Sequence, residues 1–479
     1  MNTYGQLIGG VWTKTGDGTF ETRDPAHADV VLGVFPSAGR DDVECAVTAA
    51  AEAFPAWAAT PAPVRGAILF RAAELLSERL DDIAVTLTRE EGKTLAEARG
   101  EVMRARDIVR FYAGEGWRPA GDVLPANAPQ AMLWSRREPL GVVAVITPWN
   151  FPIAIPAWKI APALAYGNTV VFKPASATPL TALRLVECFV DAGLPAGVLN
   201  FVTGSGAMAG AALTASPRLD GLTFTGSLVT GAAIYAGAAA HFTRVQLEMG
   251  GKNPTIVLDD ADLDLAVRLV LTGGFGLTGQ SCTATSRVVV EDGIAGRFAA
   301  ALAEAAAALR VGDGLEDGVQ MGPAVSADQL ATDLDYIEIG KRDGAELLAG
   351  GGRGGGSGHF VQPTVFDHVD PGSRLAQEEI FGPVVGVIRA RDLDDAIATA
   401  NAVGYGLAAS VVTGDLRRAF RFVDRIEAGV VKVNEPTTGL ALQAPFGGFK
   451  QSSANTFKEQ GTVAREFYTR TKTVYVTYG

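Results

Sequence analysis

The chain has 479 residues, of which 48% are hydrophobic and 20% are charged, and its formal net charge at pH 7 is -12. This composition excludes a disordered chain, and the length suffices for about two or three globular domains. The acidic balance excludes the basic surface that nucleic acid or an anionic membrane would need, so we expect neither as a partner.

The cysteines and the most apolar stretch indicate the compartment in which the protein is expected. Cys45, Cys188 and Cys282 are too few and too scattered for a disulfide framework, which predicts a reducing cytoplasm, and residues 1–10 show no signal peptide. Cys45 and Cys188 lie in helical stretches beside apolar residues and are predicted to be buried filler. Residues 141–172 are apolar but contain four prolines and a lysine, which predicts buried structure and not a membrane helix.

The first half of the chain is predicted to be a helical region followed by an α/β block. Residues 40–116 carry apolar side chains at helical spacing. Short apolar runs then alternate with amphipathic stretches, which predicts parallel strands joined by crossover helices. The strands are expected at 141–146, 169–172, 198–202, 222–225 and 245–247. The helices are expected near Ala157, at 180–191 and in the Gly/Ala-rich stretch after residue 202.

A second α/β block begins near Gly250. Its helices are expected at 261–271, 298–309, 394–401 and 416–426, and its strands at 287–290, 409–412 and 430–433. Two such blocks predict a cofactor domain and a catalytic domain with a cleft between them, at the carboxyl ends of the strands. The glycine-rich run 350–358 is predicted to be a flexible surface loop and not a phosphate loop, because no helix signal follows it.

One cysteine lies in a setting that suits a nucleophile. Cys282 belongs to the polar, small-residue segment 278–286, directly before a predicted strand. Backbone N–H and hydroxyl donors in such a segment lower the pKa of a thiol and leave room for a substrate. Most cysteines in polar loops are not catalytic, so this segment alone leaves the role open.

Three polar side chains come at the ends of predicted strands. Asn150 could donate to a developing oxyanion, or could be a turn residue. Glu248, followed by Gly250 and Gly251, suits a general base, or could be a solvated turn acid. Lys173 could bond a cofactor ribose, or could simply be solvated.

The remaining patterns point less clearly to a ligand. The stretch 204–210 follows a strand and opens a helix, so its N–H groups could bind phosphate. The spacing of Gly204, Gly206 and Gly210 is not the usual dinucleotide fingerprint, and tight helix–strand packing is an equal alternative. No metal site is expected, because no histidine has a metal-ligand spacing with cysteines or carboxylates. The four histidines are His27, His241, His359 and His368.

Six motifs, in the same order along the chain, resemble the aldehyde dehydrogenase superfamily over nearly the whole sequence. They are PWNFP at 148–152, FTGS at 224–227, LEMGGKNP at 247–254, GQSC at 279–282, EEIFGP at 378–383 and PFGG at 445–448. The resemblance implies an α/β fold with a Rossmann-type cofactor domain, an α/β catalytic domain and a small β oligomerisation element. The implied domains are 1–120 with 140–250, then 251–451, and finally 121–139 with 452–479. It also implies a homodimer or homotetramer.

The same resemblance assigns the chemistry. Cys282 is the nucleophile that forms a thiohemiacetal and then a thioester. Asn150 and the backbone N–H of Cys282 form the oxyanion hole. Glu248 activates the water that hydrolyses the thioester, which argues against the coenzyme-A-acylating branch. The residues implied for NAD or NADP are Ile146, Thr147, Pro148, Trp149, Lys173, Ser176, Gly206, Gly210, Phe224, Gly226, Ser227, Glu379 and Phe381.

Cofactor and substrate preferences follow from finer features of the resemblance. Ser176 stands where many NAD-preferring relatives carry a glutamate, so NADP is somewhat favoured over NAD. Residues 436–461 and 279–287 are most similar to bacterial 2-oxoglutarate semialdehyde (2,5-dioxopentanoate) dehydrogenases. The implied substrate residues are Arg104, Phe151, Trp158 and Phe446. Arg104 is the candidate anchor for a substrate carboxylate, with a solvated helix arginine as the alternative.

Two other readings of the function stay open. Succinate semialdehyde or a broad range of aldehydes could be the substrate, although succinate semialdehyde dehydrogenases often carry an arginine where this chain has Gly276. A cofactor-free thiol hydrolase is the alternative from a different class. Such an enzyme would not need Lys173 or Glu379, and no histidine lies in a context typical of cysteine hydrolases.

Overall fold

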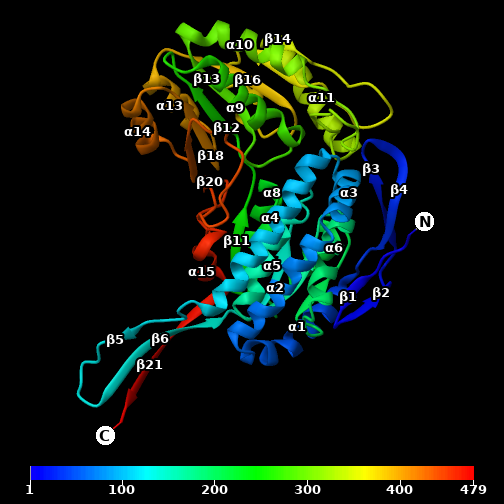
Figure 1. Ribbon diagram of the computed structural model, residues 1–479, viewed down its shortest axis with the longest axis vertical. Helices are drawn as coiled ribbons and strands as arrows, with labels where there is room; N and C mark the ends of the chain where they lie inside the picture. Colours follow the sequence, from blue (N-terminus) through cyan, green and yellow to red (C-terminus); the bar gives the residue numbers. More distant parts are fainter. Residues whose placement is uncertain (1, 479) are drawn as a thin grey trace.

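The computed structural model describes residues 2–478, which form two α/β lobes and a projecting arm (Figure 1). The first lobe is built on a seven-stranded sheet in the order β11-β10-β7-β8-β9-β1-β2. The five strands from β11 to β9 are parallel, and β1 and β2 pair antiparallel at the edge. The strands are β1 (Gln6–Ile8), β2 (Val11–Thr13), β7 (Val142–Ile146), β8 (Thr169–Lys173), β9 (Leu199–Phe201), β10 (Gly221–Thr225) and β11 (Arg244–Glu248).

Helices cover this first sheet, as expected for a parallel sheet whose strands are buried along their whole length. The helices are α1 (Arg40–Ala59), α2 (Ala62–Glu78), α3 (Leu80–Glu91), α4 (Leu95–Ala113), α5 (Ala154–Ala165), α6 (Pro179–Asp191), α7 (Ala211–Thr214) and α8 (Leu228–Ala239). Short turns η1 (Gly114–Trp117) and η2 (Gly206–Gly210) follow α4 and β9. A hairpin of β3 (Thr19–Asp24) and β4 (His27–Pro36) lies beside α3 (Figure 1).

The second lobe holds another seven-stranded sheet, in the order β14-β15-β16-β13-β12-β18-β19, in which only β14 is antiparallel. Its strands are β12 (Asn253–Val257), β13 (Thr285–Glu291), β14 (Glu346–Ala349), β15 (Thr364–Asp367), β16 (Val384–Ala390), β18 (Ala408–Val412) and β19 (Val430–Val433). Its helices are α9 (Leu263–Phe275), α10 (Asp292–Ala307), α11 (Ala327–Arg342), α12 (Arg374–Gln377), α13 (Leu393–Asn401) and α14 (Leu416–Arg425), with the 3-10 turn η3 (Gly276–Gly279) after α9.

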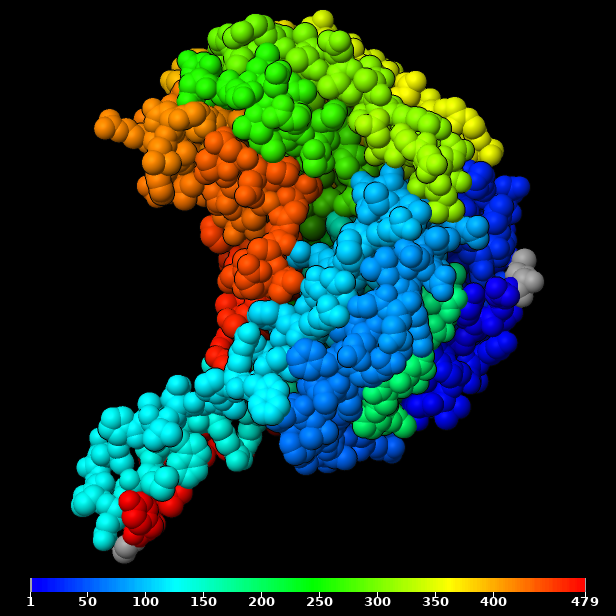
Figure 2. Space-filling view, in the orientation of Figure 1, coloured from blue at the N-terminus to red at the C-terminus, as the bar shows by residue number. Residues whose placement is uncertain are grey.

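The arm is a three-stranded antiparallel sheet that stands away from both lobes (Figure 2). It joins two segments far apart in sequence, because β21 (Thr469–Thr477) pairs along its whole length with β6 (Ala131–Pro139). Strand β5 (Val123–Leu124) pairs on the other side of β6. The short pair β17 (Tyr405–Gly406) and β20 (Phe449–Lys450), the turn η4 (Gly461–Val463) and helix α15 (Ala464–Tyr468) complete the chain.

The strands and helices predicted in the two blocks are present, and the α/β class is confirmed. Strands β12, β15 and β16 and helix α11 were not predicted. Strand β12 contains Pro254, and proline has no backbone N–H to donate to a neighbouring strand. A proline therefore argues against predicting a central strand at this position. Residues 350–358 contain no helix and no regular strand, as expected. The domain limits inferred from the resemblance stay a prediction.

Two further expectations have clear outcomes. Cys188 is buried as predicted, but the prediction for Cys45 is wrong, because this side chain lies on the exposed face of α1. Its apolar neighbours Ala46 and Val47 point inward while Cys45 does not. Within residues 2–478, no helix has both the length and the apolar character that crossing a bilayer requires.

Candidate active site

A cavity of about 300 Å³ lies where the ends of β7, β10 and β11 face the second lobe. The loops after these strands supply one wall, and the other wall comes from the segment before β13, from α11 and from residues 379–381. The cavity is lined by eight of the residues predicted for the site: Pro148, Trp149, Asn150, Gly226, Ser227, Cys282, Glu379 and Phe381. The candidate nucleophile, the candidate oxyanion donor and a carboxylate therefore share one cavity.

Cys282 lies at this cavity with its backbone held from β12. Asn253 Nδ2 donates to the carbonyl oxygens of Cys282 and Ala284, both at 2.8 Å. Burial raises the pKa of the Cys282 thiol, and the nearby acidic groups Glu379 and Glu248 raise it further. The expectation that the polar segment lowers this pKa is therefore wrong, because burial and acidic neighbours outweigh the backbone donor. A raised pKa favours the neutral thiol, which must lose a proton before it can attack.

The segment that carries Cys282 is also held by the first lobe. Leu277 and Thr278 have left-handed backbone angles, with φ of 54° and 57°. The N–H of Leu277 donates to Glu97 Oε1 on α4 at 2.8 Å. Thr278 Oγ1 donates to the carbonyl of Gly322 at 3.0 Å. Contacts from both lobes thus fix an unfavourable backbone conformation five and four residues before Cys282, the candidate nucleophile.

Asn150 is buried, and its amide is oriented by Gln280, two residues before Cys282. Its Nδ2 donates to the carbonyl of Gln280 at 2.9 Å, which leaves one amide hydrogen for a ligand. Its backbone carbonyl accepts from Lys93 Nζ at 2.7 Å, and Lys93 pairs with buried Glu101 at 2.5 Å. The other oxygen of Glu101 accepts two N–H groups at the start of α5. A buried ion pair therefore fixes the Asn150 loop, so a simple turn residue is not the better description.

Glu248 is buried at the end of β11 and is not a solvated turn acid. Its Oε1 accepts from Ser453 Oγ at 2.7 Å, and Oε2 has no partner among residues 2–478. The backbone of Gly447 lies against this carboxylate, since a Cβ there would lie 2.5 Å from Oε1. Burial, with the nearby carboxylate of Glu459, raises the pKa of Glu248 well above its ordinary value.

A buried polar network continues behind Glu248. Lys159 on α5 forms an ion pair with Glu459, and its Nζ also donates to Thr223 Oγ1 at 2.8 Å. Thr223 in turn donates to Gln246 Oε1 at 2.9 Å. The sequence analysis assigned no role to Lys159 or Glu459. A lysine inside the long apolar run was the available signal, because a charge at such a position needs a buried partner.

A second cavity of about 400 Å³ lies along α8 and is lined by Ile146, Gly206 and Gly210 of the predicted cofactor residues. Lys173 is buried close by, since its Cδ lies 4.0 Å from the position of a Cβ on Gly210. Lys173 Nζ donates to the carbonyl of Pro174 at 2.8 Å, and burial lowers its pKa to about 8, so it is not a solvated lysine. The small and apolar lining suits a flat base.

The other predicted cofactor residues line neither cavity. Ser176 Oγ donates to the carbonyl of Gly204 at 2.8 Å. The ring of Phe224 packs against Gly226, where a Cβ would lie only 2.5 Å from its Cζ. Thr147 is buried, and its hydroxyl has no partner among residues 2–478. Thr147, Ser176 and Phe224 therefore lie outside the lining of the two cavities.

Of the four predicted substrate residues, Arg104 lies on α4, Trp158 on α5 and Phe446 in the C-terminal loops, and Phe151 lies in the loop between β7 and α5. Trp158 packs 6.0 Å from the ring of Phe446, and the guanidinium of Arg104 lies 6.0 Å from the Trp158 ring. Arg104 donates to the carbonyl of Leu440, and its second nitrogen donates to Gln460 Oε1 at 2.9 Å. Lys93 Nζ lies 4.6 Å from the ring of Phe151. Arg104 is therefore largely buried and not a solvated helix arginine.

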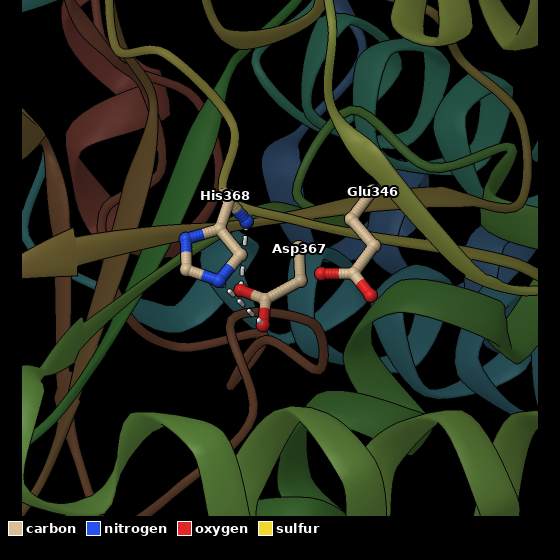
Figure 3. A group of neighbouring side chains, drawn as sticks. All are labelled: Glu346, Asp367 and His368. Carbon is tan, nitrogen blue, oxygen red and sulfur yellow. Dashed lines mark hydrogen bonds and ion pairs between the residues drawn. The ribbon is translucent and has the colours of Figure 1, made fainter.

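One histidine has acidic neighbours that its sequence spacing did not suggest. His368 lies with Asp367 and Glu346 on the adjoining strands β15 and β14 (Figure 3). The two Asp367 oxygens are already used, one by the backbone N–H of His368 at 2.8 Å and the other by Arg389. Arg389 therefore already pairs with this carboxylate.

Comparison with known proteins identifies the family to which the chain belongs. Residues 12–474 match the aldehyde dehydrogenase family, and the chain belongs to that family. It is 48% identical over 481 residues to the alpha-ketoglutaric semialdehyde dehydrogenase of Bacillus subtilis (strain 168), with 99% of this chain and 98% of the relative covered.

Solved structures agree in fold. The betaine aldehyde dehydrogenase of Staphylococcus aureus, solved in complex with NAD+, superposes with a TM-score of 0.96 at 34% identity over 99% of this chain and 94% of the other. An NADP-dependent enzyme of E. coli gives 0.96 at 39% identity over 100% of this chain and 98% of the other. The predicted family, fold and aldehyde-oxidising activity are confirmed, and the thiol hydrolase is not favoured.

Proposed function

We propose that the chain oxidises 2-oxoglutarate semialdehyde to the acid, with NADP or NAD as the hydride acceptor. The B. subtilis relative, whose name carries this substrate, matches along the whole chain. The observation that carries the proposal is the shared cavity of Cys282, Asn150 and Glu379. Nucleophile, oxyanion donor and ribose acceptor are then within reach of one bound aldehyde and one dinucleotide.

The residues present fit a dinucleotide. Helix α8 begins directly after Ser227 of the first cavity and runs along the second, so an extended ligand beside it would place one half in each. The small residues Gly206 and Gly210 leave space for the base, and Glu379 offers carboxylate oxygens for ribose hydroxyls. When bound, the nicotinamide supplies the acceptor for the hydride that leaves the substrate.

The side chains account for the chemistry on the substrate. The thiolate of Cys282 attacks the aldehyde carbon, and the carbonyl oxygen becomes negative. The side-chain N–H of Asn150 and the backbone N–H of Cys282 donate to that oxygen. Loss of hydride from the same carbon leaves a thioester on Sγ. Glu248 then takes a proton from the water that attacks the thioester, which releases the acid and the thiol.

The substrate carboxylate is assigned to Arg104. Its guanidinium contacts the Trp158 ring and the Gln460 amide oxygen, and Trp158 Nε1 and Gln460 Nε2 are buried donors that have no partner among residues 2–478. Unpartnered buried donors are costly unless a ligand satisfies them, and a carboxylate accepts several hydrogen bonds at once. The proposal therefore favours an aldehyde with an acidic far end.

A substrate panel tests the assignment. We expect kcat/KM for 2-oxoglutarate semialdehyde to exceed that for succinate semialdehyde and for uncharged pentanal. Arg104→Met should raise KM for the acidic substrates by about tenfold or more while it leaves pentanal unchanged. Equal turnover of all three aldehydes would contradict the assigned substrate but not the family.

The cofactor preference is a finer proposal. Ser176 is uncharged and tied to Gly204, so nothing at this position repels a 2′-phosphate. We expect NADP to be used at least as well as NAD. The ratio of kcat/KM for the two cofactors measures this, and a strong preference for NAD would refute it.

We also propose a cytoplasmic homo-oligomer, a dimer or a tetramer. Three free cysteines suit a reducing compartment. The arm carries Val123 at 87% and Tyr475 at 78% exposure, which is apolar surface typical of an interface. Light scattering after size-exclusion chromatography gives the molar mass, and a monomer at working concentration would refute the oligomer.

A further inference from the structure

A buried carboxylate without a catalytic assignment lies behind the first cavity, on α11. Asp333 is fully shielded from solvent, and its Oδ2 has no hydrogen-bond partner among residues 2–478. The residues one turn away on either side, Leu330 and Ile337, are buried and apolar. An unpartnered buried carboxylate oxygen destabilises the fold, and burial raises the pKa of Asp333 to about 7. Stability of the fold alone therefore does not account for an aspartate here.

The other oxygen of Asp333 holds Gln329, one turn earlier. Gln329 Nε2 donates to Asp333 Oδ1 at 2.9 Å and to the carbonyl of Ile380 at 3.1 Å. The Ile380 carbonyl can only accept, so the amide nitrogen must lie on this side whatever the protonation state of Asp333. Both amide hydrogens are used, and the amide oxygen Oε1 is left. Gln329 itself lines the cavity with Glu379 and Phe381.

Helix α11 also fixes the segment that carries these two residues. Tyr336 donates to Glu378 Oε2 at 2.7 Å. A Cβ on Gly382 would lie 2.0 Å from Asp333 Oδ1, so the carboxylate packs directly on the glycine backbone. The helix therefore contacts residues 378–382 at both ends and at Ile380 in the middle. A rigid wall at this place suits a site that must hold a ligand in one orientation.

We propose that Asp333 is a positioning residue: it holds the amide of Gln329 so that Oε1 accepts a hydroxyl hydrogen from the ribose on the nicotinamide side of the cofactor. The inference rests on the proposed cofactor site. Glu379 and Gln329 then present two acceptors to the two hydroxyls of that ribose. Asp333 acts through Gln329 and touches neither the cofactor nor the reacting atoms.

The test is the binding of two fragments, measured as dissociation constants by calorimetry on the full-length enzyme. ADP-ribose carries the second ribose, and ADP lacks it. We expect Asp333→Leu and Gln329→Leu each to weaken ADP-ribose about three- to tenfold while ADP binds as before. The double variant should lose no more than either single variant. Asp333→Asn keeps an acceptor for the Gln329 amide and should bind ADP-ribose within about twofold of the wild type.

Asp335→Leu is the matched control, because Asp335 lies on the same helix but is exposed. An equal loss for ADP and ADP-ribose would mean a general structural role and would overturn the proposal, as would unchanged ADP-ribose binding. If Asp333→Leu does not fold, Gln329→Leu and Asp333→Asn still decide, because Gln329 is only half-buried. A wild type that binds neither fragment would instead refute the cofactor site itself.

Discussion

Ser453 Oγ donates to Glu248 Oε1 at 2.7 Å and thereby leaves Oε2 as the free oxygen of a buried carboxylate. If Glu248 is the base for deacylation, Glu248→Gln should keep the first half-reaction and lose the second. We expect one burst of reduced cofactor per active site, followed by a steady state slowed by about 100-fold or more. Stopped-flow absorbance of the reduced cofactor measures both phases. A variant with the full steady-state rate would exclude this role.

The pH dependence of turnover follows from the two raised pKa values. Burial raises the pKa of both Cys282 and Glu248, so each group keeps its proton to a higher pH than it would in water. Both must lose a proton to act, and the rate should therefore increase as the pH rises above neutrality. We expect kcat/KM to rise by up to about tenfold per pH unit where Cys282 titrates, and kcat to follow Glu248 where deacylation limits the rate. A profile that is flat or falls between neutral and mildly alkaline pH would contradict these assignments.

Asn150→Ala tests the oxyanion hole. The variant removes the amide hydrogen aimed at the substrate, and it also removes the bond to the carbonyl of Gln280. Loss of one oxyanion donor lowers kcat by about 100- to 1000-fold. KM for the aldehyde should change little, because the donor acts mainly on the charged intermediate. A large change in KM with kcat preserved would assign Asn150 to binding.

The buried pair of Lys159 and Glu459 gives a prediction about stability. Lys159→Met leaves the carboxylate of Glu459 buried without its cation, and we expect a loss of about 3–5 kcal/mol in the free energy of unfolding. Lys159→Met with Glu459→Leu removes both charges and should recover part of that loss. Urea titration followed by circular dichroism measures these differences. If the single variant is as stable as the wild type, the pair is not a buried ion pair.

Ser176→Glu tests the cofactor preference in the opposite direction. A carboxylate at this position would repel the 2′-phosphate of NADP, while it could accept the ribose hydroxyls of NAD. We expect kcat/KM for NADP to fall by at least about tenfold, with NAD retained or improved. Ser176→Ala is the control, because it removes only the hydroxyl that binds Gly204. Unchanged use of NADP by the glutamate variant would mean that the 2′-phosphate lies elsewhere.

The sequence predicted what depends on periodicity and on motifs. Strands β7 and β8 are continuous valine-rich runs, and their buried positions followed directly. Asn150, Cys282 and Glu379 were found from their motifs, and they line one cavity. The direction of the pKa shift of Cys282 could not be found in this way, because it depends on acidic groups brought near from residues 248, 379 and 459.

Residues that act through long-range partners were also missed. Gln329 and Asp333 lie on α11, a helix that the sequence analysis did not identify, and their partner Ile380 is about fifty residues further along the chain. The partner of Lys159, Glu459, is separated from it by 300 positions. Such pairs form only when the two lobes and the C-terminal loops come together, so no local pattern encodes them.

The hydrogen bond from Leu277 to Glu97 ties the segment of Cys282, the proposed nucleophile, to a helix of the opposite lobe. Wide hinge opening between the lobes would break this bond and release two left-handed residues, so each such excursion would disable the enzyme until the segment reformed. A dinucleotide that enters and leaves along the cavities already present would avoid that loss. Release of the reduced dinucleotide would then need only small local rearrangements. The sulfur of Cys282 would keep its position from one turnover to the next.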